Sequence, residues 1–96
     1  MYKLVVQAAA VKMSQDAYDW YNEQQPNLGD LFLFELERCF DKLENNPLHY
    51  APSKKNFRQI RFKTFPYLIV YEIIGKDVVI FSVFHTSKNP RKKYIR

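Results

Sequence analysis

Cysteine and histidine are scarce in this sequence, which has one cysteine and two histidines in 96 residues. A single cysteine, Cys39, excludes an internal disulfide framework and fits a reducing compartment. Cys39, His49 and His85 are scattered along the chain without the short spacing of metal ligands. The sequence therefore predicts no metal site, and nothing in it indicates a cofactor.

Long apolar segments are also missing. No apolar run approaches the roughly 20 residues that a membrane-spanning helix needs. The first ten residues (MYKLVVQAAA) contain a lysine and a short apolar run, but not the extended hydrophobic region of a signal peptide. We expect one domain over residues 1–96, in the cytoplasm and without a membrane partner, since this length is too short for two independent cores.

Acidic residues become rare in the second half of the chain. Residues 1–50 have four Lys or Arg against eight Asp or Glu, whereas residues 51–96 have eleven against two. Ten of those eleven cations fall in two stretches, Lys54–Lys63 and Lys88–Arg96. Like charges concentrated in this way attract anions, and the first candidates are nucleic acids and acidic protein segments.

The first half is predicted to begin with a short strand and to continue as a helix. Tyr2–Val6 is rich in β-forming residues. From about Ala8 to Gln24, apolar residues recur at three- and four-residue steps, which places them on one side of a helix. These residues are Ala10, Met13, Ala17, Trp20 and Tyr21.

A second helix is predicted from about Asp30 to Asn45. Pro26, Asn27 and Gly29 interrupt the first helix and leave a connection short enough for antiparallel neighbours. Its expected apolar stripe is Phe32, Leu36, Cys39 or Phe40, and Leu43, and its expected solvated carboxylates are Glu35, Glu37, Asp41 and Glu44. Together the two helices form a helical hairpin.

The second half changes to a two-residue period, which is typical of strands. After a loop over His49–Asn56, the alternation over Phe57–Lys63 predicts a half-exposed strand. Tyr67–Ile74 and Val78–Phe84 are β-branched and aromatic runs, joined by a turn that contains Gly75. We predict an α+β domain of the order β-α-α-β-β-β, in which an N-terminal strand and a helical hairpin precede a three-stranded antiparallel meander. A basic tail follows over about residues 86–96.

The alternating strand also supplies candidate site residues. Arg61 and Lys63 are expected on one face, and Ile60 and Phe62 on the other. The exposed cations, with Lys54 and Lys55, would meet phosphates or an acidic segment; a solvated sheet face is the alternative. Arg58 falls on the core side, where we expect it to pair with a helix carboxylate. His85 ends the last strand, and it is either a structural histidine or an acid–base group beside the tail.

Several short segments, in this order and at this length, resemble the RelE/ParE superfamily of toxins from bacterial type II toxin–antitoxin pairs. The last strand ends in His85–Pro90 (HTSKNP), similar to the H-x-x-R-x-P ending common in these toxins, with Lys88 where arginine is usual. The other matching segments are Trp20-Tyr21, Leu28-Gly29, Asn46-Pro47, the strand with Arg58 and Arg61, and Phe65–Tyr71 (FPYLIVY).

The resemblance implies a growth inhibitor of the bacterial cytoplasm that a cognate antitoxin neutralises. The antitoxin is expected to fold an acidic, amphipathic segment onto the toxin. The cations expected to bind the antitoxin or the target are Lys54, Lys55, Arg61, Lys63, Lys88, Arg91, Lys92 and Lys93.

Two mechanisms are known within the superfamily. RelE-like members cut mRNA on the ribosome with a cluster of Lys, Arg and Tyr, including an arginine directly after the tyrosine of the third strand. Here Leu68 follows Tyr67, and Thr86 stands near the position of a second arginine. If this chain were a nuclease, the catalytic candidates would be Arg61, Lys63, His85 and Tyr94. The departures favour the ParE-like alternative, which is associated with DNA gyrase and has no catalysis of its own. A non-toxic basic binding module is a third reading.

Overall fold

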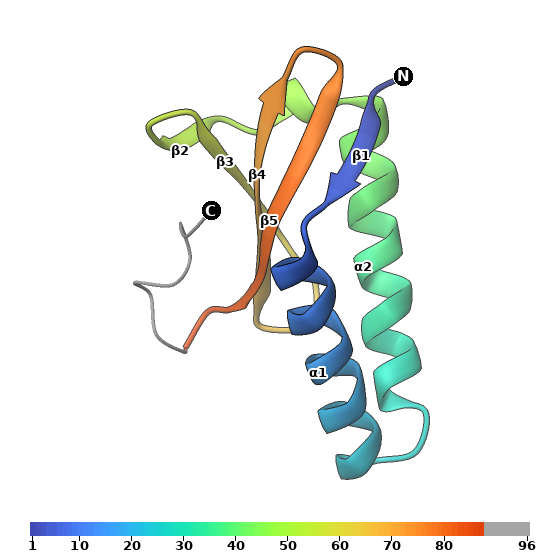
Figure 1. The fold of residues 1–96 in the computed structure, drawn as a ribbon. Coiled ribbons are helices and arrows are strands. Elements are labelled where there is room, and N and C mark those ends of the chain that lie inside the picture. The colour runs from blue at the N-terminus through green and yellow to red at the C-terminus, as the bar shows by residue number, and fades with distance from the viewer. Residues whose placement is uncertain (88–96) are drawn as a thin grey trace.

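The computed structural model describes residues 1–87, and Figure 1 shows their arrangement. The expected order of strand, helical hairpin and strands is confirmed, with two short elements added between α2 and β3. The elements are β1 (Lys3–Val6), α1 (Ala8–Gln24), α2 (Leu28–Asn45), the 3₁₀ turn η1 (Pro47–His49), β2 (Pro52–Lys54), β3 (Phe57–Arg61), β4 (Tyr67–Ile74) and β5 (Asp77–His85).

The predicted three-stranded antiparallel meander is present as β3, β4 and β5, but the whole sheet is mixed because β1 joins it as a parallel strand. Its five strands lie in the order β1-β5-β4-β3-β2. β1 runs parallel to β5, with Lys3 opposite Asp77 and Val6 opposite Ile80, and the other neighbours are antiparallel. A parallel neighbour needs a long crossover connection. The helical hairpin and the intervening strands provide that connection between β1 and β5.

The segment predicted as a loop over His49–Asn56 begins at the last residue of η1 and contains the edge strand β2. Pro52 pairs with Arg58 and Lys54 with Phe57, so β2 extends the sheet beside β3. All three residues of β2 are exposed, and Pro52 has no N–H to donate. A short, exposed edge strand with a proline shows no alternation of apolar and polar residues, so the sequence gives no sign of it.

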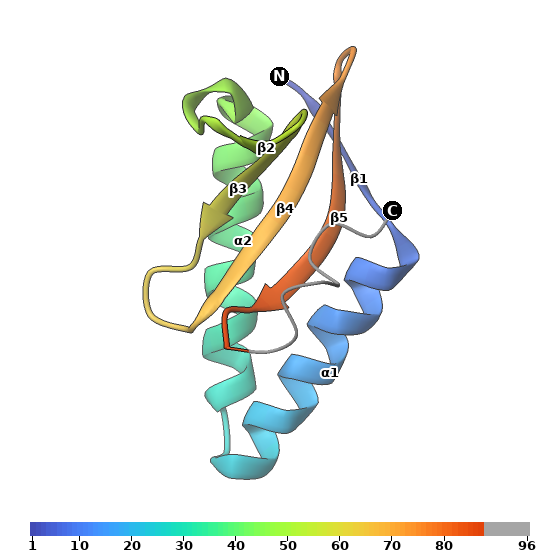
Figure 2. The ribbon, with the colours of Figure 1, turned by 90° about the vertical axis from the view of Figure 1, so that its left-hand side faces the viewer.

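Both helices pack on the same face of the sheet (Figure 2). The main core lies between them and the sheet, and Phe32 of α2 is at the centre of its aromatic part. The ring centroid of Phe32 is 4.9 Å from that of Tyr67, 5.2 Å from that of Phe62 and 5.6 Å from that of Tyr21. Aromatic pairs at such distances add to the free energy gained by burying their area.

The two helices approach closely at the start of α2. Asn27 has the left-handed backbone conformation (φ 70°), and α2 begins at Leu28, two residues before the predicted start. The Gly29 N–H donates to Asn22 Oδ1 at 2.8 Å. A Cβ atom at Gly29 would lie 2.4 Å from the carbonyl oxygen of Tyr18. The absence of a side chain at Gly29 is therefore what allows this helix spacing.

A β-bulge in β5 changes which side chains face the helices. Val70 pairs with Ser82 but Tyr71 pairs with Ile80, so β5 has one extra residue at this point. Ile80 faces the helices before the bulge, and Val83 faces them after it. The alternation then places His85 on the helix side, opposite Tyr67.

The other face of the sheet, here called the outer face, has its own apolar cluster. Phe57 and Phe81 are in edge-to-face contact there, with ring centroids 5.6 Å apart. The buried members of the cluster are Phe57, Leu68, Val70, Val79, Phe81 and Phe84.

Candidate functional site

β3 presents its cations as the alternation predicted. Arg61 is exposed, as is Lys63 just after the strand, whereas Ile60 and Phe62 are 3% and 6% exposed and belong to the main core. Arg61 lies on the outer face, since its cross-strand partner Leu68 belongs to the outer cluster.

Lys54 and Lys55 lie at the other end of β3. Both are exposed, and Lys55 has φ 53° in the loop between β2 and β3. Lys54 pairs with Phe57, four residues from Arg61 along the strand, which corresponds to about 13 Å at the usual rise per residue. The candidate cations of the described region therefore form two groups at opposite ends of β3. Lys88, Arg91, Lys92, Lys93 and Tyr94 lie outside the described residues.

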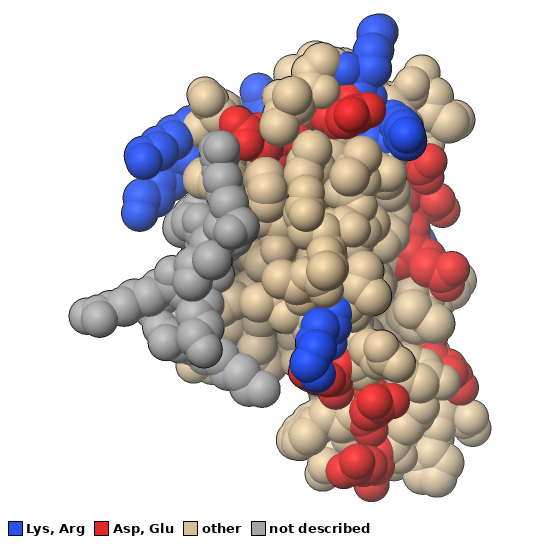
Figure 3. Space-filling view, in the orientation of Figure 1, with Lys and Arg blue, Asp and Glu red and all other residues tan. Residues whose placement is uncertain are grey.

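Charge of the two signs is unevenly distributed over the face of the molecule shown in Figure 3. Figure 3 shows a group of Lys and Arg side chains over β2, and Asp and Glu side chains along α2 and near the connection between the helices. Side chains of both signs also lie at the end of the molecule with the β4–β5 turn, and a further cation lies on α1. The acidic helical hairpin and the basic sheet edge are thus different regions of the molecule, as the charge distribution along the sequence suggested.

Arg61 and His85, two of the nuclease candidates, are on opposite faces of the sheet. Leu68, which pairs with Arg61, is 2% exposed, and Phe84, which pairs with Leu68, is 6% exposed. His85 is on the helix side, with its ring centroid 5.1 Å from that of Tyr67. Arg61 therefore stands at the rim of an apolar cluster, and the sheet separates it from His85.

The hydrogen bonds of His85 and Tyr67 limit the proton transfers open to them. Nδ1 of His85 accepts the N–H of Ser87 at 3.1 Å, so the neutral ring has its proton on Nε2. Burial, followed by the neighbouring Tyr21 hydroxyl, raises the pKa of Tyr67 to about 12. Tyr67 is therefore protonated at neutral pH and does not act as a base there.

Thr86 closes the end of the sheet. Its backbone N–H donates to the Pro66 carbonyl oxygen at 2.8 Å, and its hydroxyl donates to the same oxygen at 3.2 Å. RelE-like toxins are expected to have a second arginine near this position. In this chain Thr86 instead links the end of β5 to the corner before β4.

The expectation that Arg58 pairs with a helix carboxylate is wrong. Its guanidinium donates to the carbonyl oxygen of Tyr50, and no ion pair of Arg58 occurs among residues 1–87. The Tyr71 hydroxyl donates to the Pro47 carbonyl oxygen at 2.6 Å, and burial raises the pKa of Tyr71. Because the segment after α2 turns back across the sheet, its carbonyl groups rather than a carboxylate reach these two strand residues.

Glu35, predicted to be solvated, is half-buried and holds the corner between β3 and β4. Its Oε1 accepts the backbone N–H of Thr64 at 2.6 Å and that of Phe65 at 3.4 Å. The corner lies 29 residues away in sequence. Helical periodicity describes which side of α2 Glu35 occupies, but it carries no information on such a distant partner.

The exposure of two large apolar side chains of α2, Leu31 and Phe34, was not predicted from the sequence. Each of these side chains is 59% exposed, and the Arg38 guanidinium carbon lies 5.9 Å from the centroid of the Phe34 ring. A signal existed, because residues 31–34 read Leu-Phe-Leu-Phe. Four consecutive apolar residues extend too far around a helix for all of them to face one core.

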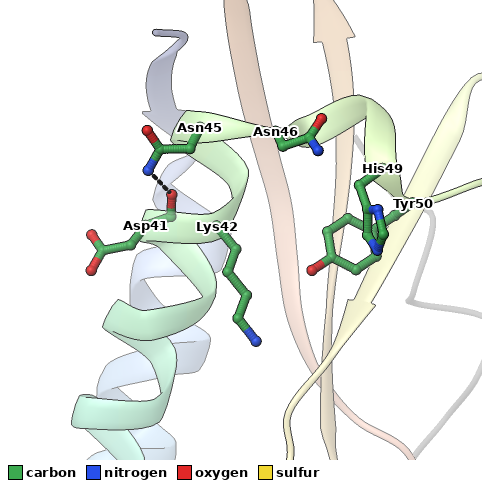
Figure 4. Close-up of a pocket in the computed structure, with 6 residues that line it drawn as sticks. All are labelled: Asp41, Lys42, Asn45, Asn46, His49 and Tyr50. Carbon is green, nitrogen blue, oxygen red and sulfur yellow. Dashed lines mark hydrogen bonds between the residues drawn. The ribbon is translucent and has the colours of Figure 1, made fainter.

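An open hollow of about 430 Å³ lies at the C-terminal end of α2. Figure 4 shows Lys42 extending from the helix toward the side where His49 and Tyr50 lie, while Asp41 points away. The lining residues are Asp41, Lys42, Asn45, Asn46, His49 and Tyr50.

Within residues 1–87, no three His, Cys, Asp or Glu side chains gather where they could hold a metal ion. Burial raises the pKa of the Cys39 thiol to about 11, so the thiolate needed for a nucleophile or ligand is scarce at neutral pH. None of the helices in this part of the chain is long and apolar enough to span a membrane.

Comparisons with known proteins agree with this fold. The family model described as "ParE toxin of type II toxin-antitoxin system, parDE" matches residues 4–90. A chain from the solved structure titled "Chromosomal ParDE TA system from P. aeruginosa" superposes with a TM-score of 0.80, at 16% sequence identity, over 91% of this chain and 98% of that one. No curated protein sequence matches significantly.

Proposed function

Because the chain belongs to the ParE toxin family of type II toxin–antitoxin systems, we propose that it inhibits bacterial growth by acting on DNA gyrase. In this proposal it binds its target in the cytoplasm without cleaving RNA, and a cognate antitoxin neutralises it. The observation that carries the proposal is the buried Leu68 beside Arg61, at the position where a ribosome-dependent nuclease of this superfamily would have a second cation.

RNA cleavage needs a base near the 2′-hydroxyl, a proton donor near the leaving oxygen and cations around the phosphorane, all within reach of one phosphate. Arg61 has Leu68 and then Phe84 as its neighbours across the sheet, and His85 lies on the opposite face. The raised pKa of Tyr67 keeps its hydroxyl protonated at neutral pH, so Tyr67 does not supply the base. The arrangement in residues 1–87 favours binding over catalysis.

The exposed cations support an anionic contact in that binding. Lys54 and Lys55 at one end of β3, and Arg61 and Lys63 at the other, would contact an acidic antitoxin segment or the gyrase–DNA complex. Each phosphate contact steepens the salt dependence of binding by about 0.9 for duplex DNA, so a salt titration separates a DNA contact from a contact with protein alone.

The mechanism is tested by inducing the chain in bacteria, mapping mRNA 5′ ends and following the DNA-damage response. We expect intact mRNA together with a DNA-damage response. New 5′ ends at codons in the ribosomal A site, absent when Arg61→Ala is induced, would instead establish the nuclease and refute action on gyrase.

A second test uses purified gyrase in a DNA supercoiling assay. A binding inhibitor acts in proportion to its occupancy of the target, so inhibition should require the chain at roughly the gyrase concentration or above. Full supercoiling activity in the presence of a large excess of folded chain would remove gyrase as the target.

A further inference from the structure

The two central strands of the sheet are apolar on both faces. β4 (YLIVYEII) and β5 (DVVIFSVFH) are nearly continuous runs of apolar residues, whereas a strand with one face in water alternates apolar and polar residues. Leu68 and Val70 of β4 point away from the helices and are 2% and 0% exposed. The outer face, which carries neither helix, is therefore buried as thoroughly as the face that packs on the helices.

The sheet does not bury its own outer face. Among residues 1–87, every buried member of the outer cluster belongs to a strand, and so does the half-buried Val5 that packs against it. Side chains of neighbouring strands shield one another sideways, but their outward ends stay open unless another layer covers them. The burial of the outer cluster therefore requires a further segment that lies across it.

Ile74 shows how exposed an apolar side chain of this face is where the cover ends. It lies two residues beyond Glu72 on β4, so alternation places both on the outer face. Ile74 is 53% exposed, whereas Glu72 is 8% and Leu68 is 2% exposed. The cover therefore extends from Leu68 to Glu72, about 13 Å at the usual rise per residue, and stops short of the β4–β5 turn.

We propose that the chain's own residues 88–96 cover the outer face of the sheet, with Tyr94 and Ile95 on the outer cluster. β5 delivers the chain to the correct end of that face, because Phe84 is its last outer residue and pairs with Leu68. A turn follows the strand directly, fastened by the bond from the Ser87 N–H to the His85 ring. Nine residues reach up to about 30 Å, more than twice the length to be covered.

Residues 88–96 contain the apolar side chains that such a cover needs. Tyr94 and Ile95 are adjacent, near the far end of the segment. Tyr94 is seven residues after Ser87, so its ring can lie up to about 23 Å from the end of β5, and Phe81 is only about 13 Å back along that strand. The edge-to-face pair of Phe57 and Phe81 offers the Tyr94 ring an aromatic surface.

Charge also selects this occupant. Glu72 is on the outer face, since its cross-strand partner Val79 belongs to the outer cluster, and a carboxylate so buried is stabilised by nearby cations. Residues 88–96 contain five Lys or Arg and no Asp or Glu. Across this face they join the cations at the two ends of β3, Arg61 and Lys54, into one basic surface. A second copy of the outer face would instead bring another buried carboxylate.

The direct test is nuclear magnetic resonance of the full chain, which detects proximity without any substitution. We expect nuclear Overhauser contacts between the ring protons of Tyr94 and the methyl groups of Val70 and Val79, because the cover puts these groups in van der Waals contact. A folded chain with no such contact from Tyr94 or Ile95 to any methyl group of the outer face would overturn the proposal. Contacts that appear only at high protein concentration would place a second copy there and overturn it too.

Hydroxyl-radical labelling then measures exposure of the outer face in the full chain. We compare Tyr94→Ser/Ile95→Ser, which removes the apolar pair, with Lys92→Ser/Lys93→Ser, a matched pair of polar positions in the same segment. The first variant should raise labelling of Phe81 at least about fivefold, since its exposed fraction would move from 7% toward the 53% of the apolar residue beside the β4–β5 turn. The second should stay within about twofold.

Circular dichroism establishes that each variant is folded, so greater labelling is not a loss of structure. Unchanged labelling of Phe81 in a folded Tyr94→Ser/Ile95→Ser variant would overturn the proposal, and so would equal increases in the two variants. If the first variant does not fold, the resonance measurement on the unchanged chain decides.

Discussion

Single residues at the tip of the helical hairpin determine how closely α1 and α2 pack. Asn27 adopts a left-handed conformation at φ 70°, which asparagine tolerates better than most residues. Gly29 then brings its backbone against Tyr18 and Asn22. The Leu28-Gly29 pair, which contributes to the resemblance to these toxins, therefore has a packing role in this chain that does not involve a ligand.

We expect Gly29→Ala to lower the free energy of unfolding by about 2 kcal/mol, because overpacking outweighs the better helix propensity of alanine. The added Cβ would lie 2.4 Å from the Tyr18 carbonyl oxygen and 2.7 Å from Asn22 Cγ. Urea unfolding measures the change. Gly75→Ala is the control: Gly75 also has a left-handed φ of 62° but nothing within 4 Å, so it should cost only about 1 kcal/mol. Equal losses in the two variants would contradict the packing role.

Between elements, Glu35 joins α2 to the corner that separates β3 from β4. Replacing it by alanine leaves the N–H groups of Thr64 and Phe65 without their acceptor. We expect Glu35→Ala to lower the free energy of unfolding by about 1–2 kcal/mol and Glu35→Gln, which keeps one acceptor oxygen, by about half as much. Glu37→Ala, on an exposed position of the same helix, should be nearly neutral. A loss as large in Glu37→Ala would mean that Glu35 has no special role.

The elements with strong periodicity were the ones that could be predicted from sequence. α1 and the strands β3, β4 and β5 are set by residues that bury one side or alternate between faces, and such patterns are local. β2 was missed because Pro52–Lys54 is an exposed edge with no alternation. The parallel pairing of β1 and the long-range contacts of Glu35 and Arg58 depend on the tertiary arrangement, which no local pattern contains.

The candidate site was predicted unevenly for the same reason. The exposure of the Arg61 and Lys63 side chains follows from the alternation of the strand and was predicted correctly. The bulge in β5 is not marked by any pattern in the sequence of the strand. It places His85 on the face of the sheet opposite Arg61. The exposure of Leu31 and Phe34 could have been read from four consecutive apolar residues, although not which two of them would be the most exposed.

Over the whole molecule, buried groups that must stay protonated make stability depend on alkaline pH. Burial raises the pKa of Cys39 from 9.0 to about 11 and that of Tyr67 from 10.0 to about 12. Between these values the unfolded chain releases a proton that the folded chain keeps, so the unfolded state gains free energy relative to the folded one as pH rises. The contribution is fully present below pH 9 and is lost as pH increases toward 12.

We expect the free energy of unfolding to fall by on the order of 1 kcal/mol per pH unit for each such group over this range. Urea unfolding at a series of pH values measures the slope. Cys39→Ala should lower stability at neutral pH, yet it should give a flatter profile above pH 9 because the thiol is gone. A constant free energy of unfolding from pH 8 to pH 11 would contradict the burial of these groups.

Over the whole molecule, a group of cations lies at the sheet edge around β2, whereas most acidic side chains lie along the helices. The anionic contact proposed for these cations matters only if the chain acts as a toxin. The most direct measurement is growth after induction of the chain alone, beside a matched culture that also expresses the adjacent antitoxin. We expect growth to stop in the first culture and continue in the second. Unimpaired growth while the full chain accumulates would contradict the proposed function.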